Sequence, residues 1–260
     1  MNDPHVVCLF YRMPDESKKL YVDPPTVELE TEGFSVLLAK GLLIASMKEH
    51  HATVEGARAT VEPFLRAWEI STGLMYGPHS LVFTFVPPAE IIDRNPPSPP
   101  RDRVYTGTVN LITGATTLTA TATILRRPYP TPPKDFVASP DVQTMWFRFG
   151  LYHDGKEPLL SMAYACLTLL EGSTGATKGS RTAVCRMYSI DQAVRDKLGD
   201  IVSERGGPTE ARKFGGTATL SPLTDQEKEW IKAVVKALIR RKAEYDAAPS
   251  AQAVRIKTST

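Results

Sequence analysis

The segment that most constrains the fold is residues 139–172, with the sequence SPDVQTMWFRFGLYHDGKEPLLSMAYACLTLLEG. Its opening Ser-Pro-Asp combines a capping residue, a proline suited to the first helical turn and a carboxylate that favours a helix N-terminus. The Asp-Gly pair at residues 154–155 indicates a tight corner, and Gly172 ends a second helix that is apolar on nearly every side. We therefore predict two helices, the second of which is the centre of a helical bundle.

Two further helices are predicted nearer the C-terminus. The Ser-Ile-Asp sequence of residues 189–191 caps one helix, which extends to about Glu204. The Thr-Asp-Gln-Glu sequence of residues 224–227 is a capping box that starts another, which extends to about Asp246. Residues 247–260 lack a periodic apolar pattern and predict a loose tail.

The first half of the chain contains runs of alternating or β-branched residues that are typical of strands. Such runs are residues 6–12, residues 26–31, residues 34–47 with a break at Lys40-Gly41, and residues 80–86. The clearest β pattern is at residues 103–125, where two runs flank Thr113-Gly114 and threonine alternates with apolar residues in the second run. The period of two in the second run, together with the turn between the runs, predicts a hairpin with one face on a core.

One long helix is predicted in this half, over residues 51–72. Its apolar positions recur at three- and four-residue steps and form one stripe, made of Val54, Ala57, Val61, Leu65 and Trp68. Gly73 is the expected end of this helix, and Pro63 is expected to bend or divide it.

Proline-rich segments divide the chain. Residues 95–101 (NPPSPPR) form a rigid connection, and residues 128–133 (PYPTPP) mark a domain boundary. The prediction is an α+β fold, in which an antiparallel-leaning sheet with one long helix is followed by a bundle of about four helices. The predicted parts are an α+β domain at residues 1–127, a linker at 128–138, a helical domain at 139–246 and a tail at 247–260.

Composition narrows the cellular setting. The three cysteines lie far apart without a Cys-x-x-Cys pair, which argues against a zinc ribbon or a disulfide scaffold and favours free thiols in a reducing cytoplasm. The chain shows neither a basic and apolar signal sequence nor a run of about 18 apolar residues that would span a membrane. We expect a cytoplasmic protein with no membrane association.

Charge is distributed unevenly, with 16 basic and 10 acidic residues in positions 178–260. Part of this excess is a basic ridge on the last predicted helix, where cations recur every four residues at Lys228, Lys232, Lys236 and Arg240. Such a ridge can follow a phosphate backbone, so RNA or an acidic protein is the expected partner. The other interpretation is a solvated helix surface.

Arg148 and His153 are separated by four residues, which is the Arg-x4-His spacing of HEPN ribonucleases, and residues 139–246 resemble the helical domain of that family. In that family a helical bundle dimerises so that two such pairs line one cleft. The resemblance implies a bacterial RNA-binding or RNA-cleaving protein of the toxin or phage-defence type. Arg148 would neutralise a phosphate and His153 would handle the proton of the ribose 2′-hydroxyl, without a metal ion.

Two features depart from the family pattern. Phe149 follows Arg148 where the family often has a polar residue, and the motif ends the first helix of the bundle where the family has it in a later helix. The structural interpretation is that Arg148 is a surface or interdomain charge. His153 would then stabilise the last carbonyl groups of its helix.

His50, His51 and Glu55 are a second candidate site, because a histidine and a glutamate one helical turn apart can share a metal ion. Two ligands without a third nearby make a poor site, so no metal ion is expected. The glycine-containing loops match neither a P-loop nor a dinucleotide fingerprint, and no Gly-x-Ser-x-Gly is present, so no cofactor is expected.

The sequence favours a non-catalytic interaction or accessory protein, with phage defence as the process that the resemblance implies. The alternative is a HEPN-like protein that binds or cleaves RNA as a homodimer through its helical domain. A metal-dependent enzyme that uses His50, His51 and Glu55 ranks last.

Overall fold

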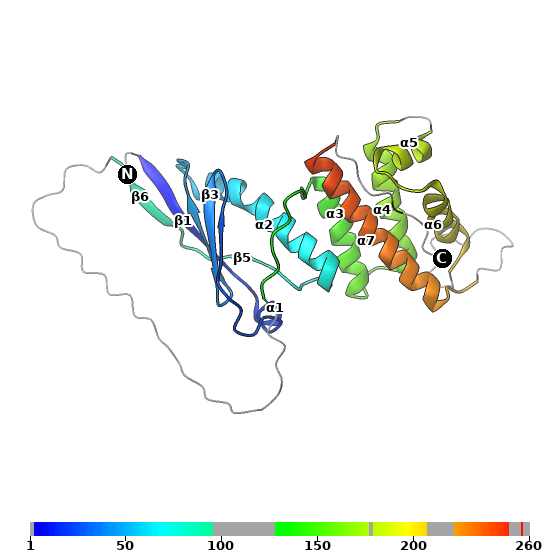
Figure 1. Ribbon diagram of the computed structural model, residues 1–260, viewed down its shortest axis with the longest axis horizontal. Helices are drawn as coiled ribbons and strands as arrows, with labels where there is room; N and C mark the ends of the chain where they lie inside the picture. The colour runs from blue at the N-terminus through cyan, green and yellow to red at the C-terminus, as the bar shows by residue number, and fades with distance from the viewer. Residues whose placement is uncertain (1–2, 96–127, 177–178, 207–220, 250–255, 257–260) are drawn as a thin grey trace, which may run out of the picture. The chain divides into compact units, whose positions relative to one another are not determined.

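The structure is a computed structural model that describes residues 3–95, 128–176, 179–206, 221–249 and 256. It divides into two compact units (Figure 1). Unit 1 consists of Met1–Glu62 and Val82–Pro130, and unit 2 consists of Pro63–Leu81 and Thr131–Thr260. The fold is α+β as predicted, with an antiparallel sheet in the N-terminal part and most helices in the C-terminal part. The predicted hairpin at residues 103–125 lies outside the described residues.

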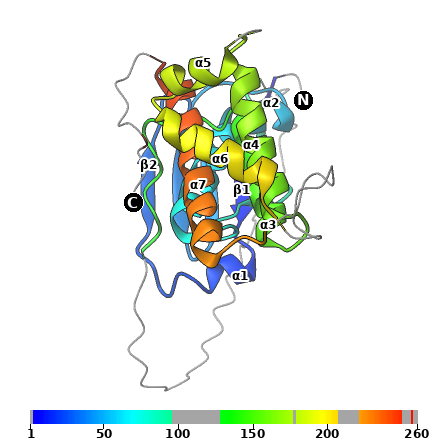
Figure 2. The same ribbon diagram turned by 90° about the vertical axis from the view of Figure 1, so that its right-hand side faces the viewer.

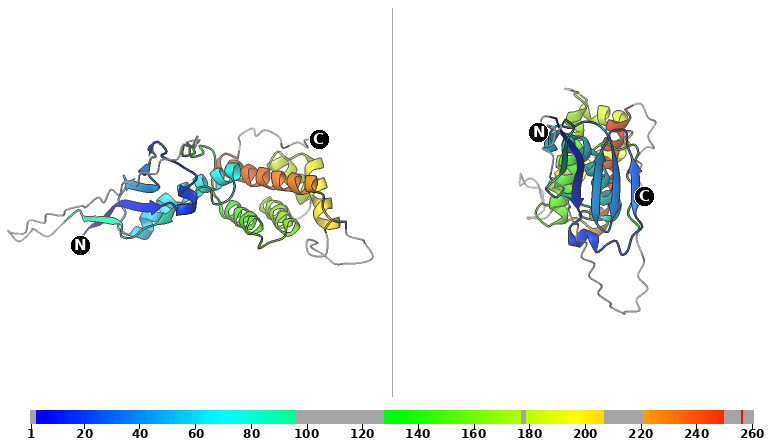
Figure 3. Two further views of the ribbon diagram at one scale, coloured as in Figure 1. Left: turned by 90° about the horizontal axis from the view of Figure 1, so that it is seen from below. Right: turned by 90° about the vertical axis from the view of Figure 1, so that its left-hand side faces the viewer.

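The sheet of unit 1 has six described strands. They are β1 (Pro4–Arg12), β2 (Val27–Glu30), β3 (Phe34–Ala39), β4 (Leu42–Met47), β5 (Thr84–Phe85) and β6 (Glu90–Asp93). The order is β2-β3-β4-β1, and β5 and β6 both pair with the free edge of β1 (Figure 3). All five pairings are antiparallel.

A two-residue turn joins β3 to β4, as the break at Lys40-Gly41 predicts. Lys40 has φ of 50° and Gly41 has φ of 77°, and positive φ at both positions fits the twist of a tight hairpin. Ala39 pairs with Leu42 directly beside this turn. The Gly41 N–H donates a hydrogen bond of 2.8 Å to the hydroxyl of Tyr129, which fixes the turn against the segment that follows residue 127.

One face of the sheet is buried. Its core side chains are Val6, Leu9, Tyr11, Phe34, Val36, Leu38, Leu43, Ala45 and Met47. Along β3 and β4 they alternate with more exposed residues, which is the period of two expected of a strand. In β1 the pairing with β6 is irregular between Val6 and Cys8, and this bulge explains why Val6 and Leu9 are both fully buried although three residues apart.

Helix α2 (Val54–Tyr76) belongs to both units. It starts after Thr53, whose hydroxyl accepts a hydrogen bond of 3.1 Å from the Gly56 N–H. Pro63 lies inside the helix without dividing it, and the boundary between the units falls directly before this residue. The predicted end at Gly73 is wrong, because the helix continues to Tyr76.

Unit 2 is a helical bundle around α4, as predicted. Besides the second half of α2, the described helices of unit 2 are α3 (Pro140–His153), α4 (Leu159–Ser173), α5 (Ser180–Met187), α6 (Gln192–Glu204) and α7 (Asp225–Ala247). Helix α4 contacts each of the other four, and Figure 2 shows α6 crossing it. Seven side chains of α4 are buried, and all of them except Leu167 share one core with Ala67, Ile70 and Leu74 of α2.

The predicted helix starts are confirmed where a side chain caps the backbone. Ser139 Oγ accepts from the Val142 N–H at 3.4 Å, and Asp191 Oδ1 accepts from the Ala193 N–H at 3.1 Å. Thr224 and the residue three positions later form the reciprocal bonds of the predicted capping box. These starts were predictable because each depends on residues within one turn of the chain.

Several elements differ from the prediction. Residues 80–86 were predicted as one strand, but β5 covers only two of them. Helix α1 (Asp15–Lys18), helix α5 and strand β6 were not predicted. Within the predicted loose tail, Ile256 forms a parallel bridge with Ile190. Among the helices that the structure describes, none combines the length and the apolar character needed to cross a membrane.

Candidate functional site

Helix α3 carries both residues of the predicted Arg-x4-His pair. Five residues advance an α-helix by about 500°, so Arg148 and His153 leave the helix about 140° apart around its axis. The structure accordingly gives each of them separate partners. Within one chain the two side chains therefore do not form a joint site.

Arg148 forms an ion pair with Glu157, which lies shortly before the start of α4. The Glu157 side chain is only 8% exposed, against 37% for Arg148. Burial raises the pKa of the Glu157 carboxyl, and the positive charge of Arg148 opposes that rise. The charge that was predicted to neutralise a phosphate is thus used to hold a buried carboxyl group of the same chain.

The thiol of Cys166 lies near this ion pair and is fully buried in α4. Burial, followed by the charge of Glu157, raises the pKa of this thiol to about 12. Its Sγ is 3.9 Å from the carbonyl oxygen of Met145, which fits a weak S–H donor. A thiol that stays protonated at neutral pH is not an effective nucleophile, so Cys166 has a packing role.

His153 is brought together with Asp154 and His79. Its Nδ1 lies 3.6 Å from Asp154 Oδ1, and the Nε2 of His79 lies 3.2 Å from the same oxygen. The two imidazole rings are 6.2 Å apart between centroids. His79 comes from the loop after α2, whereas the other two residues end α3 and begin the corner before α4. The three nitrogen and oxygen atoms therefore converge from two chain segments of unit 2.

Asp154 is the shared acceptor of this cluster. Lys156 Nζ lies 3.3 Å from its second oxygen, Oδ2, on the side that the histidines do not use. The hydrogen bond from His79, followed by that from Lys156, lowers the pKa of the Asp154 carboxyl. The group is therefore ionised at neutral pH, with Oδ1 directed at two imidazoles.

Sequence reasoning missed the role of His79 in this cluster. His79 stands 74 residues before His153, and no spacing motif connects them, so only the packing of the α2 loop on the α3–α4 corner brings them together. His79 also has a φ of 64°, a left-handed conformation that histidine adopts more readily than most residues.

The predicted metal candidates are arranged differently from the prediction. Helix α2 starts at Val54, so His51 precedes it and is not one helical turn from Glu55. His50 Nε2 lies 3.0 Å from the carbonyl oxygen of Pro4 and 3.2 Å from Asp3 Oδ1. Among the described residues, the group able to hold a metal ion consists of His79, His153 and Asp154, whereas His50, His51 and Glu55 form none.

The predicted basic ridge lies along α7, and its members differ in their partners. Lys228 pairs with Asp225 at 3.4 Å, and Lys232 pairs with Glu229. Lys236 Nζ lies 5.7 Å from the ring centroid of Phe149 on α3, and Arg240 is exposed. Within the described part of the chain, neither Lys236 nor Arg240 has a carboxylate partner.

The other two cations of α7 serve the fold. Lys242 is 6% exposed and pairs with Asp246 at 2.7 Å and with Asp141 at 3.4 Å, which ties α7 to the first turn of α3. Arg241 pairs with Glu244 at 2.9 Å. These contacts leave Lys236 and Arg240 as the cations of α7 with charge available to a partner.

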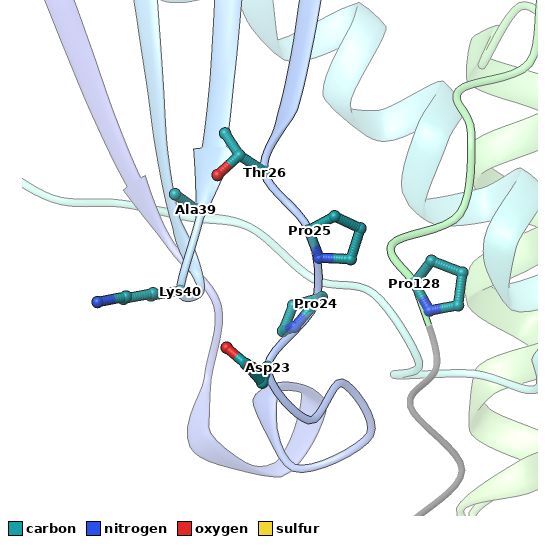
Figure 4. Close-up of a pocket in the computed structure, with 7 residues that line it drawn as sticks. All are labelled: Asp23, Pro24, Pro25, Thr26, Ala39, Lys40 and Pro128. Carbon is teal, nitrogen blue, oxygen red and sulfur yellow. The ribbon is translucent and has the colours of Figure 1, made fainter.

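A pocket with a volume of about 460 Å³ opens on unit 1 (Figure 4). It lies between the segment before β2 and the β3–β4 turn, and its lining is made of Asp23, Pro24, Pro25, Thr26, Ala39, Lys40 and Pro128. Three of these residues are prolines, and none of the predicted site residues is among them. Its two charged side chains do not form a convergent catalytic group.

Comparisons of the chain with models of protein families, with curated proteins and with solved structures found no match. Function is therefore argued from the residues and their geometry.

Proposed function

We propose that the chain is a non-catalytic interaction protein and that its helical unit binds single-stranded RNA along α7. The observation that supports binding without cleavage is the ion pair between Arg148 and Glu157. An arginine held by a buried carboxyl group of its own chain is not free to neutralise a phosphate in a cleavage reaction.

The basic face of α7 supports a polyanionic partner. Fourteen residues, from Trp230 to Ala243, contain no acidic side chain. The ridge positions Lys228, Lys232, Lys236 and Arg240 recur every four residues and rise by about 6 Å per step along the helix axis. Each step also turns by about 40° around the axis, so neighbouring members such as Lys236 and Arg240 lie on the same side of the helix, and cations spaced in this way can follow a chain of phosphates.

Aromatic rings beside these cations favour RNA over an acidic protein. Lys236 lies over the ring of Phe149, and Tyr152 of the same helix lies near Lys232, so α3 places aromatic rings beside the ridge. Lys197 of α6 lies 4.5 Å from the ring centroid of Trp230, which is in the second turn of α7. Tyr152 and Trp230 are half-buried, so each presents part of its ring to solvent. Cations mixed with aromatic rings are typical of surfaces that bind single strands.

A HEPN-like ribonuclease is the second candidate, and the position of His153 favours it. Its side chain is 52% exposed and lies beside the carboxylate of Asp154, which suits a group that transfers protons. On this alternative two copies of the chain would combine their Arg148 and His153 side chains in one cleft.

The binding proposal is tested by fluorescence anisotropy of a labelled single-stranded RNA at several salt concentrations. The test variant is Lys236→Glu with Arg240→Glu, and the control is Arg181→Glu with Arg186→Glu on α5, where both arginines are exposed. Both pairs change the net charge by the same amount. We expect the α7 pair to weaken binding and to reduce the slope of log K against log salt by about 1.4, since two phosphate contacts are lost.

The control pair is expected to leave the salt slope close to that of the wild-type chain. Equal slopes for the two variants would contradict a site on α7 and would indicate a general charge effect. Binding of an acidic peptide in place of RNA, with the same sensitivity to the α7 pair, would assign the ridge to a protein partner.

A further inference from the structure

We propose that His79, His153 and Asp154 form a binding site for a divalent transition metal ion of the Zn²⁺ class. The three side chains offer two imidazole nitrogens and one carboxylate oxygen, and these ligand atoms all lie within 4.8 Å of one another. This site is independent of RNA binding along α7, and its residues lie in the loop after α2 and in the α3–α4 corner.

The distances suit a small tetrahedral ion. Ligand atoms about 2.0–2.1 Å from Zn²⁺ stand about 3.4 Å apart at the corners of a tetrahedron. The two separations to Asp154 Oδ1 are 3.2 Å from His79 and 3.6 Å from His153. The two imidazole ligand atoms lie within 4.8 Å of one another and would have to approach further, and both side chains are more than half exposed.

The ligand set indicates the class of metal. Two imidazoles and a carboxylate suit Zn²⁺, Co²⁺, Ni²⁺ or Cu²⁺, whereas Ca²⁺ and Mg²⁺ prefer sites built from oxygen. Three protein ligands leave the fourth tetrahedral position to solvent. The ion would also join the α2 loop to the α3–α4 corner, so binding should stabilise unit 2.

Lys156 supplies a test that is specific to this site. Its ammonium group binds Asp154 Oδ2 at 3.3 Å and therefore lies beside the proposed ion as a like charge. Removing this charge should strengthen metal binding, whereas it should have no effect on Zn²⁺ bound elsewhere in the chain.

The experiment is a titration of the full-length chain, free of affinity tags and treated with a chelator, with Zn²⁺ alone. Isothermal calorimetry measures affinity and stoichiometry, and the absorption of bound Co²⁺ reports a tetrahedral site. The variants are His79→Asn, which tolerates the left-handed backbone, His153→Ala, Asp154→Asn and Lys156→Gln. The matched control is His50→Ala, since His50 is another exposed histidine beside a carboxylate.

We expect one Zn²⁺ per chain in the wild type and in the His50→Ala control. Each of the three ligand variants should bind at least about tenfold more weakly, and Lys156→Gln should bind about threefold more tightly. Circular dichroism and thermal unfolding without metal check that the exposed substitutions leave the fold intact. The proposal is overturned if the wild type fails to bind Zn²⁺ at 100 µM, or if the ligand variants bind it as the wild type does.

Discussion

Arg148, the residue predicted to neutralise a phosphate, forms an ion pair with Glu157 of the same chain. Glu157 is almost fully covered, and the pKa of its carboxyl is raised by that burial despite the adjacent guanidinium. The folded chain therefore binds a proton at Glu157 more tightly than the unfolded chain does. Stability from this source is complete below the ordinary pKa of 4.5 and is lost as the pH rises through the raised folded-state value.

Glu157→Gln should consequently be more stable than the wild type at pH 7, because it replaces a buried charge with a neutral side chain of similar shape. The difference in the free energy of unfolding should shrink as the pH falls from 7 to 5. Arg148→Met should have the opposite effect and cost about 2 kcal/mol at pH 7, since it leaves a buried carboxylate unpaired. This cost is lower than for a fully buried pair because Arg148 is 37% exposed.

Chemical denaturation at pH 7, 6 and 5 measures the free energy of unfolding of the wild type, of Glu157→Gln and of Arg148→Met. A Glu157→Gln variant that is less stable than the wild type at pH 7 would show that the ion pair is net stabilising. A difference that does not change with pH would contradict the raised pKa of the Glu157 carboxyl.

Single residues were predictable from the sequence only where their partners are near in the chain. The caps of α3 and α7 lie within one turn of the groups that they bind. Glu157 lies nine residues from Arg148, across the α3–α4 corner, and no residue pattern indicated this contact. The partnership of His79 with His153 depends wholly on tertiary packing.

At the scale of elements, α2 and α3 meet at a close contact between Gly73 and Trp146. A Cβ atom added at Gly73 would lie 2.4 Å from Cζ2 of the indole ring. This contact explains why glycine lies inside α2 instead of ending it, since a larger residue would separate the two helices. The sequence pattern predicted a helix end at Gly73 because glycine is common at such ends.

Replacement of Gly73 by alanine should therefore destabilise the protein by about 1–3 kcal/mol, although alanine is the better helix former. The matched control is Gly150→Ala in α3, where an added Cβ meets no described atom within 4 Å. The control should stabilise the protein by up to about 1 kcal/mol. Thermal unfolding compares the two variants, and a stabilising Gly73→Ala would show that α2 and α3 do not pack this closely.

Helices and strands were predictable where the residues that determine them lie close together in the sequence. The strands β3 and β4 are separated by a turn at Lys40-Gly41, and the sequence predicted either two strands or one bent strand over residues 34–47. Strand β6 has four residues, and its pairing partner β1 lies about 80 residues earlier, so its sequence carries little signal. Helix α5 is only eight residues long, carries two exposed arginines and buries Val184 and Cys185, which is a short signal for a helix.

For the whole molecule, the sequence indicated the division near residues 128–133, and one boundary between the units falls at Pro130. It did not indicate that the second half of α2 belongs to the helical unit. Ala67, Ile70 and Leu74 pack in the core of that unit, whereas Ala57 and Val61 are buried in the other. One amphipathic stripe along a helix shows that the helix is buried on one side, but not which core it joins.

The claim that the protein binds RNA without cleaving it is tested most directly by one incubation. The intact chain is mixed with a single-stranded RNA labelled at one end, and both the anisotropy and the length of the RNA are followed over time. We expect the RNA to be bound at full length, with the same result for His153→Ala. RNA that is shortened by the wild type and left intact by His153→Ala would contradict the proposal and assign the chain to the ribonuclease alternative.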